Sequence, residues 1–298
     1  MRVFVTGATG FIGSLVVKEL IAAGHQVTGV CRSDEKASAL ASAGAEVYRG
    51  SIDDPDSLKQ GAARSDGVIH LAFNHDFSKF AANCETDRRV LRALGAVLAR
   101  SDRPLILTSG TAIAKVPPGE LAGEDAPRVA SSDFPRAASE EAAADAAADG
   151  VNTSVVRLPQ VHDTKRQGLV SPWIAIAREK GEFAYVGDGR NRWPAAHVLD
   201  VARLYRLAIE RAERGATYNA VAEEGVATRD IAETLGRRLS LPVKSIAAED
   251  AQGYFGWLAH LAARDMPASS EQTRAKLGWR PTGPGLVADL ERLQVSAL

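Results

Sequence analysis

The residues best placed to do chemistry are three glycines near the start of the chain, Gly7, Gly10 and Gly13. They follow the apolar run Val3-Phe4-Val5 and lead into the helical pattern of residues 14–20. Backbone amides at the start of a helix attract phosphate, and glycines let the backbone approach it because they have no Cβ. The order strand, glycine turn, helix therefore predicts a site for the diphosphate of a dinucleotide.

The stretch Thr6-Gly7-Ala8-Thr9-Gly10-Phe11-Ile12-Gly13 resembles the glycine motif of extended and atypical members of the short-chain dehydrogenase/reductase superfamily. The resemblance covers nearly the whole chain, and it implies a nicotinamide dinucleotide cofactor and oxidoreductase chemistry. It also implies that Ser51 and Ile52 hold the adenine edge, although members usually carry Asp at the first of these positions. The residues that the resemblance places around the cofactor are Gly7, Thr9, Gly10, Phe11, Ile12, Ser51, Ile52, Leu71, Ala72, Phe73, Pro159 and Val161.

The end of the apolar run at residues 26–31 indicates which form of the cofactor binds. A carboxylate there would accept hydrogen bonds from the ribose hydroxyls of NAD, but the chain has Arg32 and Ser33, with Lys36 one helical turn further on. A charge-assisted hydrogen bond to a 2′-phosphate contributes about 1.5–3 kcal/mol. We therefore expect NADPH, held through Arg32 and Ser33. A solvated Arg32 on a surface turn is the alternative.

The segment that resembles the catalytic region of the superfamily lacks the usual residues. Members usually carry Tyr, three further residues and Lys, where this chain has Pro135-Arg136-Ala137-Ala138-Ser139, so we expect neither the proton donor nor the cation there. Gly110 stands at or beside the position of the usual catalytic Ser. The hydroxyls of Ser109 and Thr111 are then the candidate catalytic groups.

Two interpretations of this loss stay open. An enzyme without the Tyr–Lys pair must take its proton from solvent, from a nearby hydroxyl or from the substrate. A phenol beside the reacting ketone would give substrate-assisted protonation, because it donates within the substrate. The other interpretation is a non-catalytic NADP(H) sensor, which binds the dinucleotide without turnover.

Aromatic residues are frequent where a substrate would bind. They suit a bulky aromatic or polycyclic ketone better than a sugar nucleotide, whose diphosphate needs a basic cluster such as Arg190 and Arg192. The leading hypothesis is an NADPH-dependent ketoreductase of secondary metabolism, similar to the polyketide-tailoring ketoreductases of antibiotic (angucyclinone) biosynthesis. A sugar-nucleotide epimerase or dehydratase is the alternative. The aromatic residues in question are Phe73, His75, Phe77, Phe80, Trp173, Tyr185, Trp193, Tyr254, Phe255 and Trp257.

The elements that must position these residues alternate between strand-like and helix-like patterns through the first half of the chain. This alternation predicts an α/β fold with a doubly wound parallel sheet of the Rossmann type. We expect a dinucleotide-binding domain over residues 1–165 and a smaller, mainly substrate-binding lobe over 166–298, from which a strand and helix near 195–213 return to the Rossmann core. Strands are predicted at residues 2–5, 26–31, 45–49, 67–72, 104–108 and 153–157, and helices at 14–23, 35–43, 55–62, 77–100, 139–148, 199–213, 228–239 and 286–293.

Composition excludes several classes of function. With 298 residues and a formal charge of −1, the chain offers no basic surface for nucleic acid. No run approaches about 18 apolar residues, so we expect no membrane partner and a cytoplasmic protein. We expect the protein to be a monomer or a homodimer. Cys31 and Cys84 lack the spacing of metal ligands and are predicted to be buried, so no metal site is expected.

Overall fold

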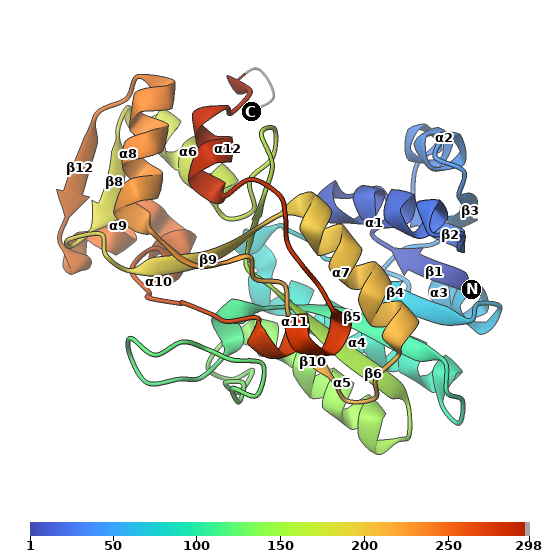
Figure 1. Ribbon diagram of the computed structural model, residues 1–298. Coiled ribbons are helices and arrows are strands. Elements are labelled where there is room, and N and C mark those ends of the chain that lie inside the picture. Colours follow the sequence, from blue (N-terminus) through green and yellow to red (C-terminus); the bar gives the residue numbers. More distant parts are fainter. Residues whose placement is uncertain (296–298) are drawn as a thin grey trace.

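A computed structural model describes residues 1–295 and shows an α/β fold built on a seven-stranded sheet (Figure 1). The strand order is β10-β6-β5-β4-β1-β2-β3, and all neighbouring strands are parallel. The chain winds one way from β1 to β3 and the other way from β4 to β10, which confirms the predicted doubly wound sheet. The strands are β1 (Arg2–Thr6), β2 (Gln26–Cys31), β3 (Glu46–Arg49), β4 (Gly67–His70), β5 (Pro104–Gly110), β6 (Asn152–Leu158) and β10 (Thr217–Asn219).

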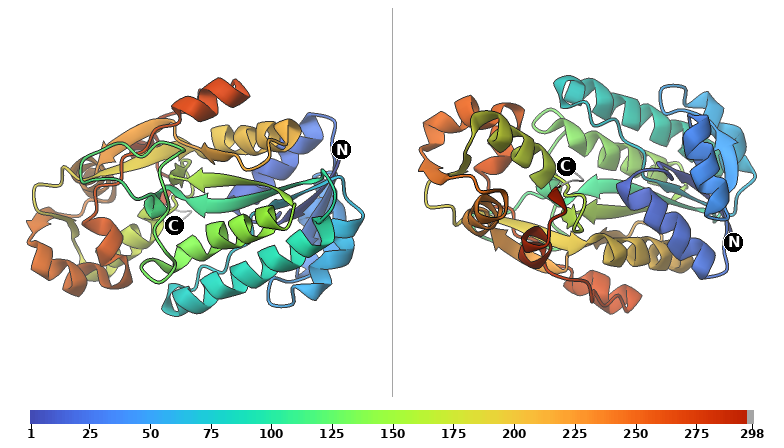
Figure 2. Two further views of the ribbon diagram at one scale, coloured as in Figure 1. Left: turned by 90° about the horizontal axis from the view of Figure 1, so that it is seen from below. Right: turned by 90° about the horizontal axis from the view of Figure 1, so that it is seen from above.

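Helices cover both faces of this sheet, with α1 and α7 packed together on one face and α3, α4 and α5 on the other (Figure 2). Successive residues of β1 supply the two layers in turn, because side chains alternate across a strand. Val3 and Val5 pack with α1 and α7, whereas Phe4 packs with α3 and α4. The helices are α1 (Phe11–Ala22), α2 (Asp34–Ser42), α3 (Asp56–Ala63), α4 (Phe80–Leu98), α5 (Ala138–Ala148) and α7 (Val198–Arg211).

The later part of the chain forms two small sheets and several helices around its own core, in which Trp173, Trp193, Phe183 and Phe255 are buried. Residues 296–298 of the predicted second lobe lie outside the described residues. No helix within residues 1–295 is both long and apolar enough to cross a membrane. The elements are β7 (Gln160–His162), β9 (Arg192–His197) and β11 (Glu223–Ala227), then β8 (Phe183–Val186) and β12 (Val243–Ile246), with α6 (Val170–Lys180), α8 (Thr228–Leu239), α9 (Ala251–Phe255), α10 (Ala259–Ala262), α11 (Glu271–Leu277) and α12 (Leu286–Glu291).

Some predicted boundaries differ from the structure for identifiable reasons. The helix predicted over 77–100 begins as a single 3-10 turn, η1 (Phe77–Lys79), which Asp76 caps by accepting from the Ser78 amide at 3.1 Å. The α-helix α4 starts only at Phe80 and ends before Arg100, whose φ of 58° is left-handed. The strand predicted over 67–72 ends at His70. The Leu71 amide still reaches the Thr6 carbonyl at 3.3 Å and shares its hydrogen with the Thr6 hydroxyl, whereas the Ala72 amide donates only to that hydroxyl, at 3.2 Å.

Two glycines of the β1–α1 turn are required by close contacts. Gly7 has a φ of +67°, and a Cβ there would lie 2.7 Å from the Ala72 nitrogen at the end of β4. A Cβ on Gly13 would overlap the Gly7 carbonyl, so the first turn of α1 can approach the loop only without a side chain. The glycine spacing in the sequence therefore reports the packing of α1 against the loop and of the loop against β4.

We predict that Gly13→Ala lowers the free energy of unfolding by about 1–3 kcal/mol, because backbone atoms must shift to admit the methyl group. Urea denaturation measures this change. Gly253→Ala in α9 is the matched control, since nothing lies within 4 Å of a Cβ built there and Ala stabilises helices relative to Gly. Equal effects of the two substitutions would contradict the packing argument.

Candidate functional site

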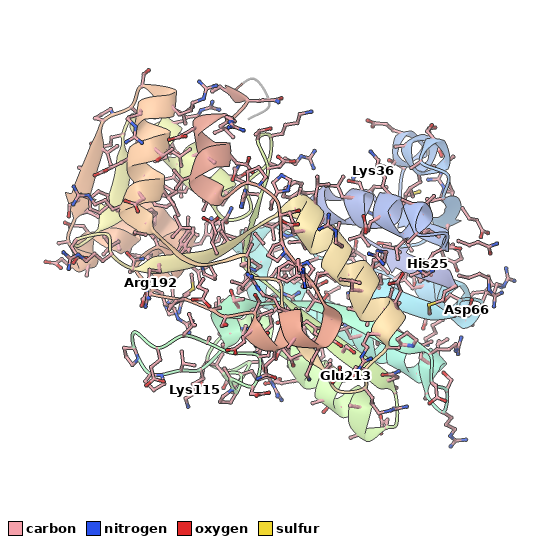
Figure 3. All side chains as sticks on the ribbon, in the orientation of Figure 1. His25, Lys36, Asp66, Lys115, Arg192 and Glu213 are labelled. Carbon is pink, nitrogen blue, oxygen red and sulfur yellow. The ribbon has the colours of Figure 1, made fainter. Side chains whose placement is uncertain are left out.

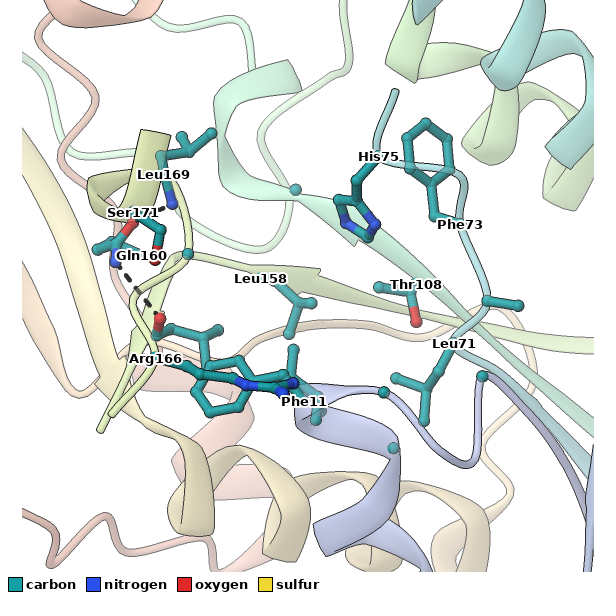
Figure 4. Close-up of a pocket in the computed structure, with 18 of the residues that line it drawn as sticks. Phe11, Leu71, Phe73, His75, Thr108, Leu158, Gln160, Arg166, Leu169 and Ser171 are labelled. Carbon is teal, nitrogen blue, oxygen red and sulfur yellow. Dashed lines mark hydrogen bonds between the residues drawn. The ribbon is translucent and has the colours of Figure 1, made fainter. Parts of the chain in front are cut away.

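A cavity of about 930 Å³ opens where the carboxyl ends of the parallel strands meet, the usual ligand position in such sheets (Figure 4). One side is formed by the β1–α1 turn and by residues after β2 and β4. The other side is formed by the ends of β5 and β6, the loop after β7 and the helix α6. The cavity thus extends from the Rossmann core to the later part of the chain.

The start of α1 is suited to an anion. Gly10 is its N-cap and makes no side-chain cap hydrogen bond, and no acidic residue stands in the first turn. The first amides of the helix are therefore available to a phosphate group. A Cβ on Gly10 would touch only the Gly7 carbonyl, at 3.2 Å, so a side chain at this position would occupy space that the cavity now provides. These features fit the diphosphate of a dinucleotide.

The structure brings together all but one of the residues predicted to bind the cofactor. Ser33 is the exception, because it is absent from the described lining and its hydroxyl instead accepts from the Lys36 amide at 3.4 Å, as the N-cap of α2. The sequence does contain the pattern of a helix N-terminus here, a Ser followed by Asp34 and Glu35, which is typical of an N-cap. The predicted residues that do line the cavity are Gly7, Thr9, Gly10, Phe11, Ile12, Arg32, Ser51, Ile52, Leu71, Ala72, Phe73, Pro159 and Val161.

Arg32 lines the end of the cavity beside β2, but its guanidinium is not free of other charges. Its side chain is 68% exposed, and its Nη1 lies 3.7 Å from the Asp53 carboxylate. The Ser51 hydroxyl accepts from the Asp53 amide at 3.2 Å and so fixes the turn that carries this carboxylate. Lys36 also lines this end, and Figure 3 shows it in the α1–α2 region. Sequence reasoning identified Arg32 and missed its acidic neighbour.

Both predicted catalytic hydroxyls border the cavity at the carboxyl end of β5, where Ser109 lies in the strand and Thr111 just after it. Ser109 Oγ is enclosed and has no hydrogen-bond partner within the described chain. Thr111 Oγ1 donates to the Leu158 carbonyl at 3.4 Å. Neither hydroxyl is bonded to a base or to a second acid that would activate it.

A buried polar network runs from the glycine turn to this part of the cavity. Thr6 Oγ1 lies 2.7 Å from His70 Nδ1, and His70 Nε2 lies 2.9 Å from the Asp87 carboxylate. On its other oxygen Asp87 accepts from Arg136 Nη1 at 2.9 Å and from Ser139 Oγ at 2.5 Å. Burial disfavours the charged carboxylate, but Arg136, His70 and Ser139 together hold the pKa of Asp87 well below its usual range.

Arg136 corrects the expectation that this segment has no cation. It lies in the 3-10 turn η3 (Pro135–Ala137), donates from Nη2 to the Thr108 carbonyl at 2.8 Å and sits with Cζ 4.4 Å from the centre of the Phe73 ring. Only 15% of its side chain is exposed, and it lines the cavity. Arg136 stands between the two positions of the Tyr–Lys pair, so the family pattern does not mark it. The η3 turn and the hydrogen bond to Asp87 determine where its side chain points.

The basic residues at the cavity are also not the predicted ones. Arg190 pairs with Asp188 in solvent, and Arg192 donates to Asp265 at 2.8 Å beside β9, outside the cavity lining (Figure 3). Three other cations lie at the rim of the cavity, on the loop after β7 and on α6, and all three residues are exposed: Lys165, Arg166 and Arg178. No sequence motif marks these three residues, two of which lie in a loop and one on a helix.

The rest of the lining is rich in aromatic rings. Phe77 stacks on Trp257 with ring centres 4.0 Å apart and planes 7° apart, which joins the loop after β4 to the later part of the chain. Trp173, Tyr254 and Phe255 instead pack in the core of the later part, and Tyr185 lies under Arg229. The rings that line the cavity are Phe11, Phe73, His75, Phe77, Phe80, Phe134 and Trp193.

Asp87→Ala should lower the free energy of unfolding by about 3–5 kcal/mol, because it leaves the largely buried Arg136 without its counter-charge. Urea denaturation at pH 7 measures the loss. Asp145→Ala is the matched control: it removes an exposed pair to Arg92 between α4 and α5, which contributes about 0–1 kcal/mol. A cost below about 1 kcal/mol for Asp87→Ala would show that the network does not stabilise the fold.

Comparisons with known proteins agree with the fold and with a nicotinamide dinucleotide as cofactor. Residues 3–221 match the profile of the family described as "NAD dependent epimerase/dehydratase family". An uncharacterized protein of Schizosaccharomyces pombe is 45% identical over 97% of this chain and 98% of its own length. A 4-hydroxy-2-methyl-3-oxo-4-farnesyl-3,4-dihydroquinoline-1-oxide ketoreductase of Stigmatella aurantiaca is 28% identical over 73% of this chain and 67% of its own. Among solved structures, a dTDP-glucose 4,6-dehydratase of Streptomyces venezuelae with NAD and TYD bound superposes with a TM-score of 0.75 at 19% identity, covering 98% of this chain and 95% of that one.

Proposed function

The chain belongs to the NAD dependent epimerase/dehydratase family, and on that premise we propose that it is an NADPH-dependent reductase of bulky aromatic or polycyclic ketones. The observation that carries this proposal is the aromatic lining that continues from the nucleotide end of the cavity. When bound, the dinucleotide supplies the hydride, and the protein holds the cofactor and the ketone against each other.

The distribution of apolar and charged residues supports a flat apolar substrate. Phe73, Phe77, Phe80 and Phe134 form one aromatic cluster, with neighbouring ring centres 5.8–6.4 Å apart. Such edge-on and tilted arrangements leave ring faces and edges available to a further aromatic ring. The loop at Pro159 and Val161, predicted to contact the nicotinamide, lines the same cavity. The narrower expectation of a polyketide substrate in antibiotic biosynthesis stays a prediction.

The acidic neighbour of Arg32 gives the cofactor assignment a sharp test. We predict that NADPH binds at least about tenfold more tightly than NADH and that Arg32→Ala removes most of this preference. Asp53→Asn should increase the preference, because it removes the negative charge 3.7 Å from Arg32 that opposes a 2′-phosphate. Calorimetric titration of both cofactors into the three proteins measures these effects. Equal dissociation constants in the unaltered protein would overturn the NADPH assignment.

A sugar-nucleotide epimerase or dehydratase is the second candidate, and one observation favours it. Lys165, Arg166 and Arg178 could together meet the diphosphate of a nucleotide sugar. We rank it second because these three cations are exposed at the rim, where water already solvates them, whereas the aromatic rings form the wall itself.

We predict NADPH oxidation in the presence of 2-acetylnaphthalene or 1-hydroxy-2-acetylnaphthalene, followed by the nicotinamide absorbance. These two ketones differ only in a hydroxyl beside the carbonyl. A gain of about 100-fold or more for the hydroxylated ketone would support substrate-assisted protonation, and similar rates would show that the substrate hydroxyl is not the proton donor.

UDP-glucose and dTDP-glucose are tested as alternative substrates with the oxidised dinucleotide, and their products are separated by chromatography, because epimerisation and 4,6-dehydration return the hydride to the sugar and leave the nicotinamide absorbance unchanged. Conversion of either sugar nucleotide, with no reduction of the ketones, would replace the ketoreductase with the second candidate. Tight NADPH binding without turnover of any of the four compounds would instead support the sensor hypothesis.

A further inference from the structure

We propose that His75 and Arg136 act together on the ketone, with His75 donating the proton and Arg136 binding the carbonyl oxygen. The proposal rests on the ketone reduction proposed above and deepens it by naming catalytic residues. It assigns chemistry to two side chains that neither the glycine motif nor the predicted hydroxyls include.

The two side chains come from different elements and meet at one ring. His75 belongs to the loop after β4, and its imidazole lies 5.4 Å from the Phe73 ring in an edge-on contact. The Arg136 guanidinium covers the same ring at 4.4 Å. Both residues line the cavity, and Figure 4 shows the His75 ring pointing into it. A carbonyl oxygen in this part of the cavity would face a proton donor and a cation.

Arg136 keeps donors free for such an oxygen. A guanidinium has five N–H donors. Nη1 uses its two on Asp87 and Ser139, and Nη2 uses one on the Thr108 carbonyl. Within the described chain Nε–H and the second hydrogen of Nη2 have no acceptor. Because the side chain is largely buried and held from three directions, these donors are already oriented before an oxyanion develops.

His75 is the group whose proton can move. Partial desolvation and, next in importance, the positive charge of Arg136 lower the pKa of His75 below its ordinary value, while the Phe73 backbone raises it by less. The rings packed against His75, Phe73 and Phe77, carry no charge. Asp87 lies beyond the guanidinium and is bonded to it. The residue is also exposed, so its imidazole can recover a proton from water.

The step balances with the reduced nicotinamide dinucleotide as hydride donor. A C–H bond of the reduced nicotinamide breaks, which oxidises that ring, and a C–H bond forms at the carbonyl carbon as the C=O π electrons move to oxygen. The oxygen then takes the proton from a ring nitrogen of the His75 imidazolium, and the neutral imidazole is reprotonated by water. Arg136 stabilises the oxygen while it carries negative charge and is not itself deprotonated.

Other hydroxyls near the cavity are less suited to donate. Ser109 Oγ is enclosed, and Thr111 already donates to Leu158. Tyr205 is fully buried against Thr108, at 2.7 Å between the oxygens, and burial raises its pKa, so its phenol holds the proton more strongly. His75 is the group here whose acidity is increased.

The first measurement follows the histidine imidazoles by NMR during a pH titration, and a His75→Phe spectrum assigns the His75 signal. We expect His75 to titrate below about pH 6.5. Removing the Arg136 charge should raise this midpoint measurably, since a nearby like charge is lost. Arg136→Gln is made together with Asp87→Asn, so that no unpaired buried carboxylate remains to unfold the protein. An unchanged midpoint in this double variant would overturn the coupling of the two residues.

The second measurement is kcat/KM for 2-acetylnaphthalene with NADPH between pH 5 and pH 9. Reduction needs the protonated imidazole, so kcat/KM should fall as pH rises through the pKa of His75. In the double variant this fall should occur at a higher pH. His75→Phe, which preserves the ring packing, should lose about 100-fold or more and abolish the limb. Arg136→Lys should retain more activity than the double variant, because it keeps the charge.

His260→Gln is the control, because this histidine packs beside Phe134 but is exposed and outside the cavity lining. It should leave both readouts unchanged. If the unaltered protein reduces the ketone and His75→Phe loses less than about tenfold, the proton donor is another group and this inference falls alone. If the unaltered protein reduces neither ketone, the proposed function fails and the inference fails with it.

Discussion

The carboxylate of Asp87 must find its counter-charge inside the protein, because burial has taken it out of water. Three elements meet this need together: β4 brings His70, η3 brings Arg136 and α5 brings Ser139. His70 links the same carboxylate to Thr6, whose hydroxyl also accepts hydrogen bonds from the two amides after β4. One buried carboxylate thus holds Arg136 directly and is linked, through His70, to the strand that precedes the glycine turn.

The cavity has two ends with different physical characters. At the end formed by the glycine turn and β2, backbone amides and exposed cations face solvent. The attraction of these cations for a phosphate depends on neighbouring carboxylates such as Asp53. At the other end, rings exclude water from a guanidinium that still has free donors. An ion's attraction for a polar group strengthens as water is excluded, so Arg136 carries more weight in the site than the more numerous rim cations.

The sequence predicted those parts of the protein whose geometry is local. The limits of β2 and α8 agree with the structure because periodicity and flanking turn residues lie within the segment itself. The glycine turn was equally readable. Ser33 caps α2 by accepting from the Lys36 amide, a role that the sequence analysis did not give it. Its O–H is still a possible donor, so the contact with a 2′-phosphate stays a prediction. Arg136 was missed because its direction is set by Asp87, 49 residues earlier in the chain, and no short-range pattern records such a partner.

The stacking of Phe77 on Trp257 has a consequence for how such a protein can diversify. Both rings are carried by segments outside the strands of the seven-stranded sheet: η1 follows the loop after β4, and Trp257 lies in the 3-10 turn η5 (Gly256–Leu258) between α9 and α10. Insertions or exchanges in these segments leave the contacts of Gly7, Gly13 and β4 intact. The mouth of the cavity can thus be remodelled separately from the nucleotide cradle, and a lineage can acquire new substrates while it retains one cofactor.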